Sequence, residues 1–376
     1  MNITLFLPRS NHIKILGSVA AEAKVRNHTI HIWTPPGDVK RAGAYEHALH
    51  ELGHLASVGP ELSTGTPDWV IAVGLKTGAS TRRLMRGQGI RWAALDSCGD
   101  NLIHFVEDEA STDNWDLTFT LAQEPAAFAA RLADYECGAL PIGYPELDQL
   151  DSVIGDKATC RVKWNLPQHQ RIVLFGPAAR PIRLGRVRRW WFHHVYYRRI
   201  LWGLRQWANM TGALIVAKTR IKHGDPTWLG RYCDRIIGDE AFYPFTTLEL
   251  LRAADLYVGF ASAMAIEAAA IGLPQVHLHG WTPERGEWPT ALPLKRAFFI
   301  DKGGLWNCVG SRSVACYGED WPMRLHETLD DVLAEFSLAG SGEMRHACER
   351  WAGPLDGHAS STGSPNPSRS DGNART

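Results

Sequence analysis

Apolar positions in the first part of the chain fall in short runs, separated by stretches with helical spacing. The first 35 residues predict a strand over residues 3–7, a helix over 13–25 and a second strand over 29–33. Further strands are predicted at residues 69–73, 91–95 and 117–121. Strands that alternate with helical stretches are typical of a parallel sheet covered by helices.

A second alternation of the same kind begins after residue 148. Strands are predicted at residues 171–175, 213–218, 256–259 and 274–278, with helices ending near 209 and spanning 247–254 and 263–271. Between the two patterns, the prolines and glycine of residues 140–148 predict an extended connection rather than a helix. We therefore expect an α/β protein with two Rossmann-like domains, residues 1–148 and 149–358, and a disordered polar tail over 359–376.

Charge is unevenly distributed, although 40 Lys and Arg balance 40 Asp and Glu. No acidic residue lies between Asp156 and Asp225, and that stretch contains fifteen Lys or Arg. Such a segment suits a phosphate-bearing ligand or an anionic surface. The seven cysteines form no CxxC pair, and neither a signal peptide nor a membrane span is evident, so a reduced cytoplasmic protein is expected.

The turn between the strand ending at Gly259 and the next helix is a candidate anion site. Small residues there, Ser262 and Ala263 among them, would let a phosphate approach the free N–H groups of the helix. Glu267, five residues after Ser262, could accept hydrogen bonds from a ribose diol. The alternative is that Ser262 only caps the helix and Glu267 is a solvated helix residue.

Two residues of the first domain are candidates for a general base. His12 follows the first predicted strand, and ligands of parallel sheets lie beyond the carboxyl ends of the strands. An imidazole titrates near neutral pH and can accept a proton from a hydroxyl group. Asp96, which also follows a strand, is the rival, and a cap or turn role is open for both.

The stretch from Asp255 to Pro274 resembles the donor-nucleotide motif of GT-B-fold glycosyltransferases. The resemblance is greatest to relatives of CDP-glycerol glycerophosphotransferases and extends to UDP-N-acetylglucosamine 2-epimerases. Further pieces occur in the family's order: a G-x-P-x-x-D-like connection at 142–148, a strand and loop at 174–177, a K-x-H-like strand end at 217–223 and a closing motif at 355–360. The resemblance implies donor contacts from Gly176, Lys218, Arg220, His223, Ser262, Ala263 and Glu267.

Two positions depart from that family pattern. Phe260-Ala-Ser-Ala stands where members usually have Asp-Tyr-Ser-Ser, so one Asp and one Ser are missing. At the K-x-H position, Arg220 follows Lys218 by two residues and His223 is displaced, although positive charge is retained.

The resemblance implies a metal-independent transferase with a nucleotide-linked donor and no cofactor. It would move a sugar or glycerophosphate unit to a surface-polysaccharide or lipid-linked acceptor. Two alternatives are a UDP-sugar 2-epimerase-like enzyme and a catalytically degenerate binding subunit.

Arginines and aromatic residues are concentrated between Arg180 and Trp207. This composition is typical of a helix at a membrane interface, with rings at the headgroup level and guanidinium groups on anionic lipid. The segment predicts contact with an anionic membrane surface or a lipid-linked acceptor, at the inner face of the membrane. Nucleic acid fits the charge but is not the expected partner. The alternative is a helix whose tryptophans pack on the sheet.

One motif indicates different chemistry: His50-Glu51-Leu-Gly-His54 matches the HExxH zinc signature. Gly53 weakens the helix that the motif needs, and no glutamate follows between Glu61 and Glu107 as a third ligand. We therefore expect no metal site there.

Overall fold

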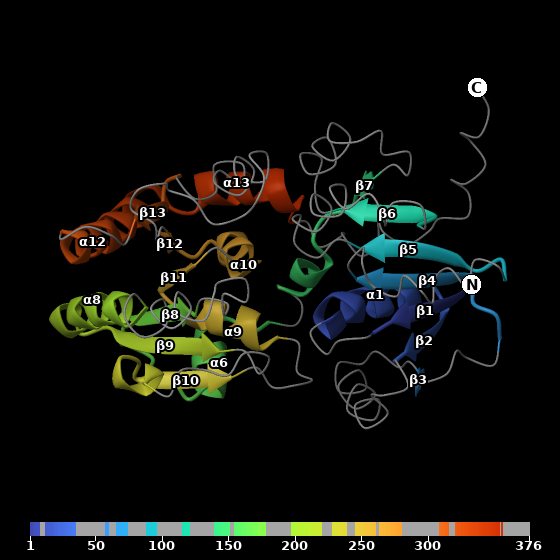
Figure 1. The fold of residues 1–376 in the computed structure, drawn as a ribbon, viewed down its shortest axis with the longest axis horizontal. Helices are drawn as coiled ribbons and strands as arrows, with labels where there is room; N and C mark the ends of the chain where they lie inside the picture. The colour runs from blue at the N-terminus through green and yellow to red at the C-terminus, as the bar shows by residue number, and fades with distance from the viewer. Residues whose placement is uncertain are drawn as a thin grey trace, which may run out of the picture. The chain divides into compact units, whose positions relative to one another are not determined.

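A computed structural model describes the fold of the chain. The described residues are 1–7, 12–34, 57–59, 65–73, 88–95, 115–120, 139–150, 154–177, 197–219, 228–238, 245–260, 263–279, 308–315, 320–353 and 355. They form two compact units, each with its own parallel sheet (Figure 1). The first unit is built on the described residues of Met1–Leu150 and also includes residues 349–353 and 355, whereas the second is built on those of Asp151–Glu240 and Phe245–Cys348.

The sheet of the first unit has the strand order β3-β2-β1-β4-β5-β6-β7, and all pairs are parallel. Its strands are β1 (Asn2–Phe6), β2 (Thr29–Trp33), β3 (Ser57–Gly59), β4 (Trp69–Val73), β5 (Arg91–Leu95), β6 (Leu117–Thr120) and β7 (Ala139–Pro141). Helix α1 (Ile13–Val25) connects β1 to β2 and packs its apolar residues into the core of this unit. The predicted βαβ opening is confirmed.

The sheet of the second unit has the order β10-β9-β8-β11-β12-β13, again with parallel pairs only (Figure 1). Its strands are β8 (Ile172–Gly176), β9 (Leu214–Thr219), β10 (Arg235–Gly238), β11 (Leu256–Phe260), β12 (Gln275–His279) and β13 (Ser311–Ala315). Its helices are α6 (Lys157–Lys163), α8 (Tyr197–Thr211), the 3-10 helix η6 (Leu229–Arg231), α9 (Thr246–Ala253), α10 (Ala263–Ile271), α12 (Trp321–Ala339) and α13 (Gly342–Ala352), whose end belongs to the first unit. The expected α/β class with two Rossmann-like domains is confirmed.

The two faces of the second sheet differ in chemistry. Helices α8 and α12 cover one face, where Val173, Leu256 and Val276 join Trp207 and Trp321 in a single apolar core. Alternate residues along each strand point to opposite faces. The remaining strand positions therefore point to the opposite face, where α9 and α10 pack on the sheet.

An aspartate precedes four of the strands and joins each to its neighbour. In every case, the aspartate N–H donates to a carbonyl of the adjacent strand, and the Oδ2 of its side chain accepts from the N–H of that same residue. The pairs are Asp68 with Asn2, Asp116 with Trp92, Asp234 with Ile215 and Asp255 with Ile172, with N···O distances of 2.7–2.9 Å. We call this reciprocal pair of bonds an aspartate clasp. It satisfies backbone groups at the amino edges of both sheets.

The connection at residues 140–148 is only partly extended, and that prediction was wrong in part. Strand β7 is followed by the 3-10 helix η4 (Pro145–Gln149), which packs against α1. Pro145 suits the first helical position because its ring fixes φ. The Glu146 carboxylate, fully buried, forms an ion pair of 2.7 Å with Lys14 of α1. The family-like connection is therefore held to the first unit by the packing of η4 on α1 and by this ion pair.

Candidate functional site

The chain order of the second sheet defines one topological switch point, between β8 and β11. From β8 the chain proceeds outward to β9 and β10, and it then returns to β11 on the other side of β8. Ligands of open parallel sheets bind beyond the carboxyl ends of the strands at such a point. Both strands bring a glycine to this place, because Gly259 is the register partner of Gly176.

Tyr257 explains why both positions are glycine. Its side chain is buried on the same face, and a Cβ atom added to Gly259 would lie 2.3 Å from its hydroxyl oxygen. At Gly176 the corresponding distance is 2.7 Å. Real Cβ atoms do not approach so closely, so neither position accepts a side chain while the ring stays in place. Gly176, expected to contact the donor, thus has a structural role on this face.

Buried polar residues flank these glycines on the same face of the sheet. Lys218 lies on β9, next to the register partner of Phe175, and its residue is 4% exposed. His277 of β12 pairs in register with Gly259, and its Nε2 lies 3.3 Å from Ser311 Oγ. Lys218 places a buried cation near the carboxyl edge, which is suited to binding an anionic group, whereas His277 lies in the middle of β12 and its Nε2 is close to the first residue of β13.

Two residues separate the end of β11 at Phe260 from helix α10, which begins at Ala263. Glu267 lies within this helix and is 1% exposed. The alternative of a solvated helix residue is therefore wrong for Glu267. Carboxylates are seldom buried unless they are paired, so its position indicates a specific role. Ser262, Arg220 and His223 lie outside the described residues.

The predicted base of the first unit, His12, is the residue before α1. It is 7% exposed and makes no side-chain capping bond to the helix. The capping alternative is thus wrong for its side chain. Asp96, the rival base, lies outside the described residues.

The basic aromatic segment is described only from Tyr197 onward, as helix α8. Tyr197 and Trp207 belong to the apolar core, and Trp207 Nε1 donates to Asp330 at 2.9 Å. Trp202 is 47% exposed. Arg198 and Arg199 lie over the rings of Trp228 and Trp321. This part of the segment is therefore mostly a helix that packs on the sheet, as the alternative to a membrane helix predicted, with Trp202 left at the surface.

The HExxH residues His50, Glu51 and His54 lie outside the described residues. Within the described part of the chain, no group of three or more His, Cys, Asp or Glu is arranged to hold a metal ion. Among the same residues, no helix is long and apolar enough to cross a membrane.

Sequence reasoning did not identify Tyr257, His277 or Ser311. The signal available was local: Tyr257 and His277 each lie between two apolar residues of β11 and β12, and Ser311 begins β13. In a sheet buried on both faces, such polar positions are exceptions to a continuous apolar run. They mark the face on which the candidate site lies.

No protein-family model and no curated protein matches the sequence. Solved structures do share the fold. A UDP-N-acetylglucosamine 2-epimerase from Listeria monocytogenes is similar with a TM-score of 0.63 at 12% identity, over 96% of this chain and 94% of that one. The enzyme of the same description from Neisseria meningitidis gives 0.58 at 13% identity, over 93% and 98%. A wall teichoic acid polymerase, TagF, gives 0.61 at 11% identity, over 96% and 86%.

These similarities define the class of fold. The chain has the two-domain α/β architecture of the GT-B type, a fold that it shares with solved structures of epimerases and a glycosyltransferase.

Proposed function

We propose that the chain is a sugar-nucleotide enzyme of the GT-B type that transfers a sugar or glycerophosphate unit from a nucleotide-activated donor to an acceptor hydroxyl. The observation that carries the proposal is the buried Lys218 near the carboxyl edge of β9, beside the switch point, together with the buried carboxylate of Glu267 in α10. The fold neighbours support it, since one is described as bound to UDP-GlcNAc and another, MnaA from S. aureus, as a complex with UDP.

In glycosyl transfer, the bond between the anomeric carbon and the donor's diphosphate oxygen breaks, and the nucleoside diphosphate leaves with the electron pair. The acceptor oxygen forms the new bond, and its proton passes to a base. In glycerophosphate transfer, the acceptor attacks the distal phosphorus and a nucleoside monophosphate leaves. In both reactions, negative charge develops on the leaving phosphate.

The residues of the second unit are suited to stabilising that charge. Lys218 supplies a positive charge, and the first N–H groups of α10 point outward at the helix start. Preorganised groups of this kind stabilise a developing anion without a metal ion. Glu267 would hold the ribose hydroxyls, and His12 would accept the acceptor's proton, with Asp96 as the rival base.

Nucleotide binding tests the donor assignment. Calorimetric titration of UDP, CDP and GDP should identify one preferred nucleotide. Lys218→Gln and Glu267→Gln should each weaken its binding about 10- to 100-fold, as expected for lost hydrogen bonds to charged groups. Glu327→Gln, on an exposed position of α12, is the matched control. Unchanged affinity in both site variants, with melting temperatures near wild type, would contradict the assignment.

Turnover tests the base. His12→Ala should retain nucleotide affinity and lose about 100-fold or more in kcat, because a base acts only in the transition state. If Asp96→Ala abolishes turnover and His12→Ala does not, the roles are exchanged.

The alternative reactions give different products. A 2-epimerase acting on UDP-GlcNAc would invert C2 without releasing UDP, which proton NMR of the sugar distinguishes from transfer or hydrolysis. A degenerate binding subunit would bind the nucleotide and give neither product.

A further inference from the structure

A cavity of about 820 Å³ lies at the amino edge of the second sheet, where β8 and β11 begin. Residues of α6, α9 and α12 line it together with the segment before β8. The proposed donor site belongs to the carboxyl edge of the same sheet, so this cavity is a separate feature. Its volume lies in the range of small-molecule sites.

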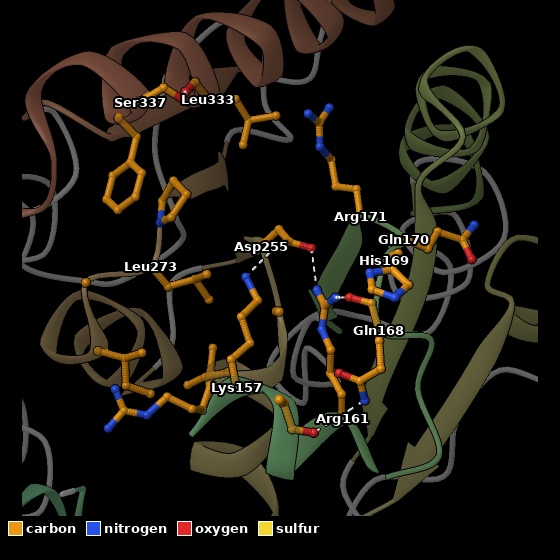
Figure 2. A pocket seen from close by; sticks show the side chains of 18 residues that line it. Lys157, Arg161, Gln168, His169, Gln170, Arg171, Asp255, Leu273, Leu333 and Ser337 are labelled. Carbon is orange, nitrogen blue, oxygen red and sulfur yellow. Dashed lines mark hydrogen bonds and ion pairs between the residues drawn. The ribbon is translucent and has the colours of Figure 1, made fainter. Parts of the chain in front are cut away.

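The lining of the cavity carries an excess of positive charge. Four cationic residues and a single carboxylate, that of Asp255, line the cavity and give it a formal charge of plus three; the cations are Lys157, Arg161, Arg171 and Arg252. Arg171 is exposed and forms no ion pair with any described residue. Figure 2 shows its guanidinium group pointing away from Asp255.

Asp255 holds two of these cations in place. Its Oδ1 lies 2.5 Å from Lys157 Nζ, and its Oδ2 accepts from Arg161 at 2.7 Å (Figure 2). Arg161 is further fixed by its bonds to the carbonyls of Ala253 and Gln168. Side chains already held in position lose little conformational freedom when an anion binds.

The opposite wall of the cavity is apolar. Leu333 and Phe336 of α12 contribute to it, together with Leu273 and Pro274, which precede β12. Cationic groups on one side and an aromatic ring with aliphatic side chains on the other fit a ligand with an anionic and an apolar part. A nucleotide or a similar organic phosphate has this division.

We propose that this cavity binds a soluble organic phosphate, with its phosphate groups at Arg171 and Lys157 and its apolar part against Leu333 and Phe336. Bidentate contacts from a guanidinium group suit phosphate oxygens. The site lies at the amino edge and the proposed donor site at the carboxyl edge, so the two ligands would contact different residues.

Acetylation of lysines tests the proposal at the site itself. Lys157 and Lys163 lie on the same helix, their side chains are 47% and 46% exposed, and each forms an ion pair with a carboxylate. Only Lys157 lines the cavity. The full-length protein is treated with acetic anhydride in the presence of inorganic pyrophosphate or ADP, and the acetylation rates of both lysines are measured by peptide mass spectrometry.

We expect both probes to slow acetylation of Lys157 at least threefold without slowing Lys163, and ADP to act at a lower concentration than pyrophosphate. Arg171→Glu should abolish this protection. Arg345→Glu, an exposed position on α13, should leave it intact. Equal protection of both lysines, or none at 10 mM probe, which is about the weakest affinity of interest, would overturn the proposal. Protection that persists in Arg171→Glu, or equal potency of the two probes, would also overturn it.

Discussion

The ring of Tyr257 determines which residues its neighbours at the switch point can be. It lies over Gly259 on its own strand and over Gly176 on the next, and it is fully buried. A buried tyrosine gives the second sheet a large contact area, and each glycine in a strand costs stability because of its backbone freedom. The sequence at this point is therefore a compromise between packing and backbone entropy.

Gly259→Ala should destabilise the protein by about 1–3 kcal/mol, as overpacking of a core does. Tyr257→Val removes the ring and should also destabilise. In the double variant, the alanine no longer meets the ring. Its loss of stability should therefore be smaller than the sum of the two single losses by about 1 kcal/mol or more. Urea denaturation of the four proteins measures this coupling, and strict additivity would show that the ring does not exclude the methyl group.

Burial also controls the chemistry of three cysteines. It raises the pKa of the Cys160 and Cys308 thiols to about 11 and that of Cys233 to about 12. A thiol in the folded protein thus stays protonated at a pH where the unfolded chain has begun to ionise. The thiolate is the reactive form, so these cysteines should resist modification while the protein is folded.

Because the folded pKa of Cys233 is raised, its contribution to stability is complete below about pH 8.5, where the unfolded thiol begins to ionise. That contribution is lost as the pH rises toward 12. We expect the free energy of unfolding to fall between pH 8 and pH 10.5 more steeply in wild type than in Cys233→Ala. Denaturation curves at both pH values test this, and parallel slopes for the two proteins would contradict it.

At the scale of secondary-structure elements, the amino edges of both sheets share one feature, the aspartate clasp between neighbouring strands. At Asp255 the clasp has an additional charge, since Arg161, 6% exposed in its side chain, pairs with the same carboxylate. At Asp234 the partner Arg205 is 21% exposed. The same motif therefore stabilises to different extents at the two places.

Asp255→Ala should cost about 3 kcal/mol, because it leaves a strand N–H and a buried guanidinium group without their acceptor. Asp234→Ala should cost only about 1 kcal/mol, since its ion pair is more exposed. Chemical denaturation compares the two variants directly. An equal loss of stability in the two variants would contradict the prediction that burial of Arg161 makes Asp255 the more important aspartate.

The elements that sequence patterns predicted are those with a local signal. Helix α1 and strands β2, β4 and β5 were predicted with the bounds that the structure has. Short edge strands such as β3 and β10 were not predicted, because three or four residues carry no readable periodicity. The 3-10 helix η4 was missed because its formation depends on a tertiary contact, the ion pair of Glu146 with Lys14.

The sequence predicted only those parts of the candidate site that lie within a single continuous segment of the chain. The strand-to-helix turn at Ala263 and the buried Glu267 and Lys218 belong to segments singled out from the sequence. The pairing of Gly176 with Gly259 and of His277 with Ser311 depends on strand register across distant segments. No pattern within one segment contains that information.

At the scale of the whole molecule, charge is balanced overall and concentrated locally. The chain has 40 basic and 40 acidic residues, and residues 157–224 contain none of the acidic ones. Part of this excess faces the amino-edge cavity through Lys157, Arg161 and Arg171. A molecule of zero net charge can thus attract anions to one region and not to others.

Contact with an anionic membrane is expected from the basic aromatic segment between Arg180 and Trp207. Each basic residue near such a surface contributes about 1 kcal/mol, and salt weakens the attraction. In sedimentation with phosphatidylserine vesicles at low salt, we expect part of the protein to pellet and the exposed Trp202→Ala variant to pellet less. Protein that stays wholly in the supernatant with anionic vesicles would contradict this expectation.

The aspartate clasps have a consequence for how strands find their partners. Alternation of side chains distinguishes a strand shifted by one residue from the correct one, because the shift exchanges the two faces. A shift by two residues restores the faces. In strands such as β4 and β11, which are buried along their whole length, such a shift changes the burial of apolar side chains very little. The clasp makes the shifted register less stable, since an aspartate moved by two residues loses both of its bonds to Asn2 or Ile172. A single carboxylate before a strand thereby discriminates against the misfolded pairing that hydrophobicity alone tolerates.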